Sequence, residues 1–254
     1  MSLFTRLPIY APGVLPVIAE TDIDYLSSYE VSAYEHWVFD TANADSLIGA
    51  VNKKLLIAQS TPPVYSANYI SMTNYPVGKG LLTDLDDSAT PSDTMFAVVR
   101  DTSTKGLQGI FGSLGTSAEG GGGVIFNLQD AARTAFAYHH GVSTSTSTPA
   151  DVPAIAGQWR FVACSRAFAA GNNVLRILVG GGNGNELANT GTYLKAPTGR
   201  KLGLGSPYFP ASGVSTFQVD YAEFGVFKRA LTLADLKAVY ARSKVRMAQR
   251  GIVI

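Results

Sequence analysis

The sequence has few of the features that mark membrane, disulfide-rich or nucleic-acid-binding proteins. Its 254 residues include a single cysteine, Cys164, so the chain cannot build a disulfide framework. Charged residues make up 15%, against about 25% in typical domains, and the net charge is only +1. No run approaches the roughly 20 apolar residues that cross a bilayer, and the start lacks the apolar core of a signal peptide. We therefore expect a protein made in the cytoplasm, with no membrane insertion and no nucleic-acid partner.

The sequence is rich instead in glycine, serine, threonine and short apolar runs, a composition typical of many short strands joined by tight turns. We predict strands at residues 36–39, 95–100, 110–111, 124–128, 134–138, 159–164, 174–179 and 216–227. The strand at 174–179 is the expected hairpin partner of 159–164. Near Tyr221 the apolar residues change from odd to even positions, which predicts a bulge or a strand buried on both faces. The alternating serine and threonine residues at 143–148 are interpreted as a mobile loop.

One helix is predicted near the end of the chain. Thr232 can cap it, Asp235 follows three residues later, and Leu233, Leu236 and Val239 recur at helical spacing. Many strands with one terminal helix favour a β-sandwich.

Five segments occur in the order seen in laminin-G-like, or concanavalin-A-like, jelly rolls. They are residues 36–40 (HWVFD), 97–100 (AVVR), 157–163 (GQWRFVA), 201–205 (KLGLG) and 221–232 (YAEFGVFKRALT). The chain resembles this family over roughly residues 36–242, and the closing strand that runs into a short helix is the most specific segment. The resemblance implies an all-β fold: a two-sheet antiparallel jelly-roll sandwich with one short C-terminal helix.

The expected organisation has three parts. Residues 1–30 form an extended N-terminal arm because their repeated prolines exclude a helix. Residues 31–243 form the sandwich, and residues 244–254 form a C-terminal tail. Residues 1–45 hold seven acidic side chains and one basic, a net charge of −6, whereas residues 228–254 carry a net charge of +6. The two ends are either solvated or paired with each other, within one subunit or between neighbours.

Chains with such a domain, an arm and an ending like residues 250–254 resemble bacteriophage virion proteins of the tail, baseplate or collar. The resemblance implies a virion structural or attachment protein. Its partners would be other virion proteins, further copies of itself in a homo-oligomer, and a host surface polysaccharide. The alternative is a free, calcium-dependent carbohydrate-binding lectin module. A glycan-degrading enzyme is a third hypothesis, because the fold is shared by lectins, hydrolases and structural modules.

Catalytic patterns are missing from the sequence. Glycoside hydrolysis needs two carboxylates facing one bond, and the nearest candidate string, at residues 20–24, has the wrong spacing and precedes the domain. No Gly-x-Ser-x-Gly motif occurs. His139 and His140 could bind a metal, but neighbours on a strand point to opposite faces, so the two cannot easily share one ion. We therefore expect no enzymatic activity.

Two groups of residues remain as candidate binding sites. Asp84, Asp86 and Asp87 could supply oxygen ligands to calcium, which the resembled family often holds in loops, or they could lie in a solvated turn. Tyr208 and Phe209 lie between two prolines and could form an exposed aromatic platform for carbohydrate, or could pack under their loop. Trp37 and Trp159 match family positions that fill the core.

Overall fold

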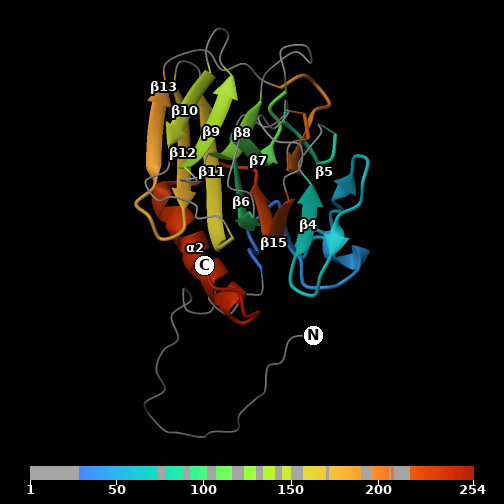
Figure 1. Ribbon diagram of the computed structural model, residues 1–254. Coiled ribbons are helices and arrows are strands. Elements are labelled where there is room, and N and C mark those ends of the chain that lie inside the picture. Colours follow the sequence, from blue (N-terminus) through green and yellow to red (C-terminus); the bar gives the residue numbers. More distant parts are fainter. Residues whose placement is uncertain are drawn as a thin grey trace, which may run out of the picture.

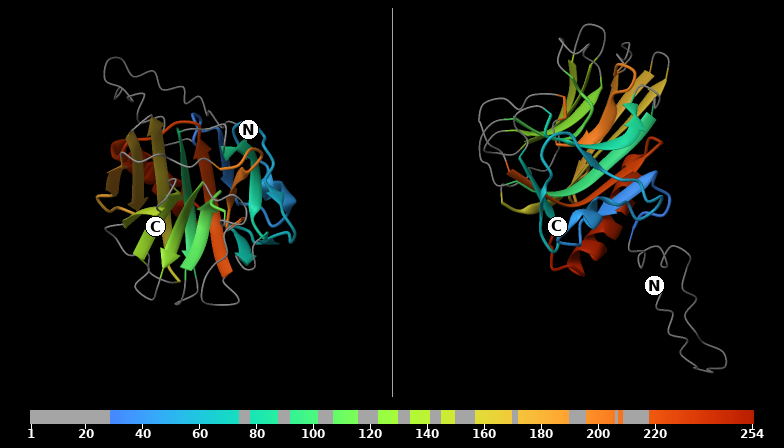
Figure 2. Two further views of the ribbon diagram at one scale, coloured as in Figure 1. Left: turned by 90° about the horizontal axis from the view of Figure 1, so that it is seen from above. Right: turned by 90° about the vertical axis from the view of Figure 1, so that its right-hand side faces the viewer.

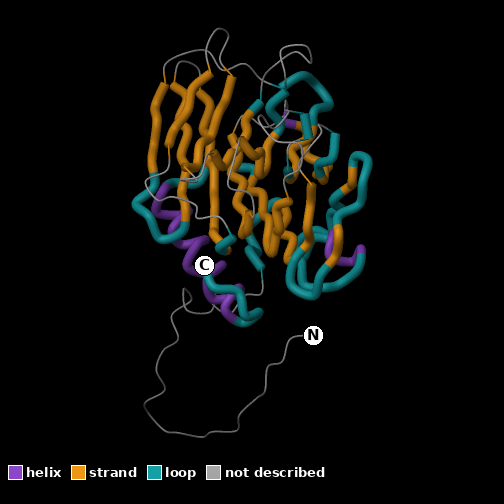
Figure 3. Tube along the Cα trace, viewed as in Figure 1, coloured by secondary structure: helices purple, strands orange, loops and turns teal. Residues whose placement is uncertain are grey.

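Two antiparallel sheets packed face to face make up most of the molecule (Figures 1 and 2). The structure is a computed structural model that describes residues 29–73, 78–87, 92–101, 107–115, 123–129, 134–140, 145–149, 157–169, 172–189, 196–205, 207–208 and 218–254. Within these ranges strands predominate, with one long helix and one 3-10 turn (Figure 3). The predicted all-β jelly-roll sandwich with a C-terminal helix is therefore confirmed.

The first sheet has eight strands among the described residues, and all their pairings are antiparallel. Its order is β13 (Asn185–Asn189), β12 (Asn172–Val179), β11 (Trp159–Ala169), β6 (Ser92–Asp101), β15 (Gln218–Phe227), β4 (Ile70–Thr73) and β3 (Val64–Tyr65), with β1 (Glu35–Val38) also paired to β15. The predicted hairpin is present as β11 and β12, with Val162 opposite Val179.

The second sheet has seven strands in the part of the chain that the structure describes. Its order is β10 (Ser145–Pro149), β9 (Thr134–His140), β8 (Val124–Gln129), β7 (Leu107–Gly112), β14 (Lys201–Leu204), β5 (Leu81–Asp86) and β2 (Ile57–Ala58). The loop predicted at residues 143–148 is wrong, because Ser145–Pro149 forms β10 and pairs with β9. A strand at the edge of a sheet can be polar and can end in proline, since its outer backbone groups face solvent.

Strand β15 lies at the centre of the first sheet and is buried on both faces. Its pairing with β6 skips Ala222, between Tyr221 and Glu223, so the predicted bulge is present. Before the bulge Val219 and Tyr221 face the space between the sheets, and after it Phe224 and Val226 do. The extra residue thus keeps apolar side chains in the core after the phase of the sequence has changed.

Two apolar cores result from this arrangement. The larger lies between the sheets and includes Trp37, whose ring stacks on Phe224 with centroids 5.4 Å apart. The smaller lies on the outer face of the first sheet, between side chains of β6 and β11 and helix α2 (Leu233–Ala248). Figure 1 shows the helix beside this sheet. Trp37 therefore fills the core, as expected.

Helix α2 begins as predicted, with a capping box between Thr232 and Asp235. It continues to Ala248, so the boundary expected after residue 243 falls inside the helix. Gly251 then adopts a left-handed conformation, with φ of 72°, which turns the chain so that Ile252 packs into the smaller core. The last residues are thus part of the folded domain rather than a separate tail. No helix among the described residues is long and apolar enough to span a membrane.

Candidate functional site: an open polar cleft

An open cleft of about 400 Å³ lies between the segment that follows β1 and the C-terminal end of α2. Polar and charged side chains alternate along it with a few apolar ones. The lining residues are Tyr29, Val38, Asp40, Asp45, Ile48, Gly49, Ala50, Lys53, Arg246, Gln249 and Arg250. Two walls form this cleft, and a different buried network holds each of them.

A turn at residues 49–54 forms the first wall, and the buried carboxylate of Glu35 organises it. The backbone N–H groups of Val51, Asn52 and Lys54 donate to Glu35 at 2.8–2.9 Å. Gly49 leaves the space for this carboxylate, since a Cβ there would lie 2.1 Å from Glu35 Cδ. Several N–H groups thus converge on one buried charge and fix the turn without any bound ligand.

Lys53 lies at the rim of this wall in a left-handed conformation with φ of 59°. This conformation strains any residue with a side chain and favours glycine. Lys53 is exposed, and its Nζ contacts the carbonyl of Ala50 at 3.3 Å. Non-glycine residues in such conformations often cluster at functional sites.

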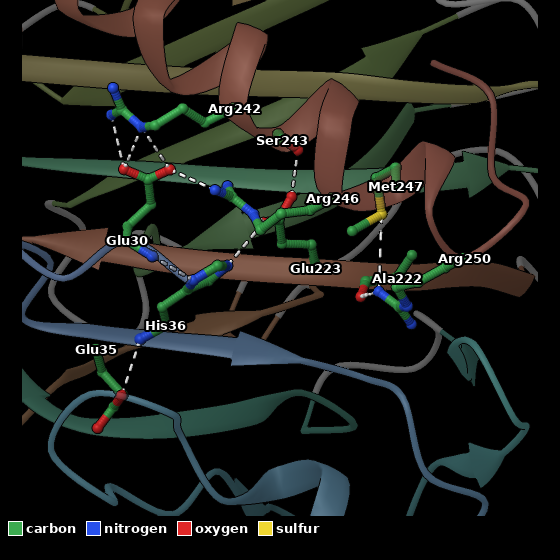
Figure 4. Close-up of polar contacts among 10 residues, drawn as sticks. All are labelled: Glu30, Glu35, His36, Ala222, Glu223, Arg242, Ser243, Arg246, Met247 and Arg250. Carbon is green, nitrogen blue, oxygen red and sulfur yellow. Dashed lines mark hydrogen bonds and ion pairs between the residues drawn. The ribbon is translucent and has the colours of Figure 1, made fainter. Parts of the chain in front are cut away.

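The second wall is held by a charged group that we call the helix cluster: Glu30, His36, Glu223 and Arg246, which are buried, and Arg242, which is partly exposed (Figure 4). Arg242 makes a forked contact with Glu30, with Nε 3.1 Å and Nη2 2.7 Å from its carboxylate. Arg246 bridges the two acids: its Nε donates to Glu223 at 2.7 Å and its Nη1 lies 2.8 Å from Glu30 Oε1. The oppositely charged ends of the chain therefore pair within one subunit.

His36 occupies a single tautomer in this cluster. Its Nδ1 accepts the N–H of Glu30 at 2.9 Å, so the proton sits on Nε2, which faces Glu223 Oε1 at 2.8 Å. Burial alone would raise the pKa of Glu223, but Arg246 and His36 outweigh burial and lower the pKa to about 2. Ser243 also donates to Glu223. The carboxylate lies between the serine and the histidine and all three are fully buried, so this is not a catalytic triad.

Arg250 joins the end of the chain to three other segments. Its guanidinium donates to the backbone carbonyls of Ala222 at 2.9 Å, Asn68 at 2.6 Å and Phe39 at 2.5 Å. Burial lowers the pKa of Arg250, and the nearby charge of Asp40 opposes this shift. The sequence indicated neither this role nor that of Glu35, because both depend on backbone groups brought together by the fold.

The predicted calcium ligands are not brought together by the structure. Asp84 accepts from the Tyr34 hydroxyl at 2.8 Å and from Lys54 Nζ at 2.7 Å. Asp86 accepts the N–H of Gly199 at 2.7 Å, whereas Asp87 is buried and contacts other side chains. The described residues contain no group of three or more His, Cys, Asp or Glu that could hold a metal. Asp84 and Asp86 lie on strand β5 rather than in a turn, and each of the three already has its own partner.

Asp87 belongs to a second buried charged group, the inter-sheet cluster: Asp87, Asp93, Ser113 and Arg166. Arg166 of β11 and Asp93 of β6 face each other in the first sheet, and Arg166 Nε donates to Asp93 at 2.8 Å. Asp87 and Ser113 follow strands of the second sheet, and Arg166 also contacts Asp87. Burial raises the pKa of Asp93 to about 6, although Arg166 opposes the shift.

The aromatic candidates are only partly described. Tyr208 is half-buried, its hydroxyl accepts the N–H of Lys201 at 3.1 Å, and its ring lies 5.2 Å from the Arg200 guanidinium. Phe209 lies outside the described residues, so the predicted platform stays a prediction. Trp159 is partly buried beside Arg100, whose guanidinium lies 4.7 Å from its ring.

The chain belongs to the concanavalin A-like lectin/glucanases superfamily: a laminin-G family model with that description matches residues 82–237, well over half of the chain. No curated protein matches the sequence. The family match agrees with the fold expected from the five ordered segments.

Solved structures of similar fold include two kinds of protein. One is the receptor binding domain of botulinum neurotoxin type G, with a TM-score of 0.58 and 10% identity over 84% of this chain and 52% of that one. The ligand binding domain of serotype D, in complex with N-acetylneuraminic acid, gives 0.55 and 11% over 85% and 52%. Trypanosoma rangeli sialidase, in complex with sialic acid, gives 0.55 and 13% over 87% and 34%. This chain therefore spans about half of the toxin domains and a third of the sialidase, and the likeness establishes the fold.

Proposed function

We propose that this protein is a non-catalytic glycan-binding module that serves in a virion as a structural or attachment protein. The observation that carries the proposal is the open polar cleft, whose walls are fixed in advance on a sandwich of the lectin and glucanase superfamily. A site fixed before binding loses less conformational entropy when a flexible sugar binds.

The chemistry of the cleft suits a sugar. Each hydroxyl of a sugar both donates and accepts hydrogen bonds, so a receptor needs acceptors and donors side by side. Asp40 and Asp45 offer exposed carboxylates, Lys53 offers an exposed ammonium group, and Gln249 offers an amide. Tyr29 adds a partly exposed ring at the same place. Such mixed polar groups around a concave surface are typical of ligand sites.

The same residues favour binding over hydrolysis. The general acid of a glycosidase is usually held in an environment that raises its pKa, such as an apolar pocket. Asp40 and Asp45 are exposed to solvent instead. Glu30 and Glu223 are buried and engaged by arginines, so a substrate would have to break the helix cluster to reach them.

The virion role rests on the resemblance described above and on the class of the similar structures. Several of these are receptor binding domains, and this chain spans about half the length of each. By analogy, this chain would contact other virion proteins, as an oligomer, and present its cleft to a host surface polysaccharide.

A glycan array with matched variants tests the proposal. Lys53→Gly removes the ammonium group while supplying the residue that the left-handed conformation favours, and Asp40→Asn removes one exposed carboxylate. Lys237→Ala is the control, because Lys237 is exposed on α2 and does not line the cleft. We expect both cleft variants to weaken binding of the best glycan about tenfold, and the control to leave it unchanged.

Two results would overturn the proposal. Equal binding by all three variants would remove the cleft as the site. Release of reducing sugar from the bound glycan, abolished in Asp40→Asn or Asp45→Asn, would show an enzyme.

A further inference from the structure

An apolar stripe is exposed at the edge of the cleft, and of its three residues only Ile48 also lines the cleft. It consists of Ile48, Leu55 and Ile57, whose exposed fractions are 46%, 50% and 58%. Ile48 and Leu55 are opposite each other in an isolated antiparallel bridge, so their side chains are adjacent. Ile57 follows Leu55 by two residues and shares its face of the chain.

The inner side of the same segment is packed, which makes the stripe a distinct surface. Leu47 and Leu56 alternate with the stripe residues and are buried, with exposed fractions of 6% and 1%. A group of adjacent exposed apolar residues commonly marks a contact surface. Strand β2, which contains Ile57, is also the last strand of its sheet among the described residues.

The N-terminal segment reaches the domain next to this stripe. Tyr29 and Ile48 line the same cleft, and residues 1–28 precede Tyr29. This segment contains the apolar residues Leu3, Phe4, Leu7, Ile9, Val14 and Leu15, separated by prolines that exclude a helix. At about 3.3 Å per extended residue, a chain running back from Tyr29 spans the stripe with many residues to spare.

We propose that residues 1–28 bind in extended form across the stripe of their own molecule. The apolar side chains of the segment cover Ile48, Leu55 and Ile57, which removes exposed apolar surface from both partners. The segment borders the cleft as it leaves Tyr29 and places an intramolecular strap along one rim. This inference does not depend on the ligand of the cleft.

Limited trypsin digestion tests the strap, because Arg6 is the one Lys or Arg between residues 1 and 52. Cleavage after Arg6 follows the population in which the segment is detached. We expect the double variant Leu55→Ser/Ile57→Ser to be cleaved there about tenfold faster than the unchanged chain. The control is Val64→Ser, because Val64 is 69% exposed on β3, in the other sheet. This variant is expected to match the unchanged chain.

Two outcomes would overturn the proposal. Equal cleavage rates for the double variant and the unchanged chain would show that the segment does not lie on the stripe. Protection that rises with protein concentration would show that a second copy covers the stripe instead. Glycan binding measured on the same variants separates this result from the proposed function, since Leu55 and Ile57 do not line the cleft.

Discussion

The helix cluster and the inter-sheet cluster are both largely buried, but they differ in the groups that surround their carboxylates. The helix cluster sets two carboxylates, Glu30 and Glu223, against two guanidinium groups. The inter-sheet cluster sets Asp87 and Asp93 against the guanidinium of Arg166. The pKa of Glu223 falls to about 2, whereas the pKa of Asp93 rises to about 6. Burial acts in the same direction on both acids. Arg246, His36 and Ser243 together outweigh it at Glu223, whereas at Asp93 Arg166 is opposed by the charge of Asp87, so the set of neighbouring groups decides the sign of the shift.

The stability contributed by the two clusters should also respond to pH in opposite directions. Because the pKa of Glu223 is lowered by folding, its contribution to stability is present above its usual pKa and is lost as the pH falls toward 2. Because the pKa of Asp93 is raised by folding, its contribution is full below its usual pKa and is lost as the pH rises through 6. The two clusters therefore favour opposite ends of the acidic range.

Breaking the helix cluster should have the largest effect on the free energy of unfolding. Glu223→Gln leaves Arg246 buried with one acid instead of two, and removing one partner of a buried pair typically costs about 3–5 kcal/mol. Urea unfolding at neutral pH measures this change. Glu186→Gln is the control, since Glu186 is 45% exposed beside Arg176 and exposed pairs contribute about 0–1 kcal/mol. Equal losses in the two variants would contradict the role given to the helix cluster.

Two truncations that differ by two residues test the contribution of Glu30 to the helix cluster. Deletion of residues 1–28 should leave the sandwich folded, because the helix cluster stays complete. Deletion of residues 1–30 removes Glu30 from Arg242 and Arg246 and should cost about 3 kcal/mol more. Thermal unfolding of both proteins measures the difference. Similar stability would show that Glu30 belongs to the arm, as its sequence position suggested.

The stability contributed by the inter-sheet cluster should depend on pH, and Asp93→Asn should remove this dependence. The amide resembles the neutral acid. The free energy of unfolding of the variant should therefore rise relative to that of the unchanged chain by about 2–3 kcal/mol as the pH increases from 4 to 7. Unfolding free energies across this range provide the measurement. A variant that loses stability relative to the unchanged chain as the pH rises would show that Arg166 keeps Asp93 charged.

The smallest effect is expected from calcium. Asp84, Asp86 and Asp87 have separate partners, so calcium has no assembled set of carboxylates to bind among them. Saturating calcium should leave the melting temperature unchanged, whereas a ligand that binds the native state would raise it. A clear rise that Asp84→Asn abolishes would restore the predicted site.

The fold could be predicted because its signals are local. The phase change near Tyr221 required a bulge, and the spacing from Thr232 to Asp235 defined the start of α2. The polar strand β10 was missed because its alternation carries no apolar face. Local patterns therefore predict elements whose inner faces are apolar.

The candidate site depended on contacts that spacing cannot reveal. Glu30 and Arg242 are 212 residues apart in sequence, and only the opposite charges of the two ends hinted at their pairing. Glu35 binds backbone N–H groups, which every residue carries, so no sequence pattern could identify it as the organiser of a turn. Three nearby aspartates suggested one metal site, but each found a different partner.

The contact between Glu30 and Arg242 also has a consequence for the order of folding. Arg242, Arg246 and Arg250 are synthesised after every strand that the structure describes, and Glu30 and Phe39 cannot make their contacts with them until then. The central strand β15 also comes late, so until it is made β1 lacks its partner strand and β4 is paired with β3 alone among the described strands. Folding that waits for such distant pairings is slow, because long loops must close before contacts compensate for the lost entropy. The nascent sandwich should therefore remain open through most of its synthesis and close in one late step.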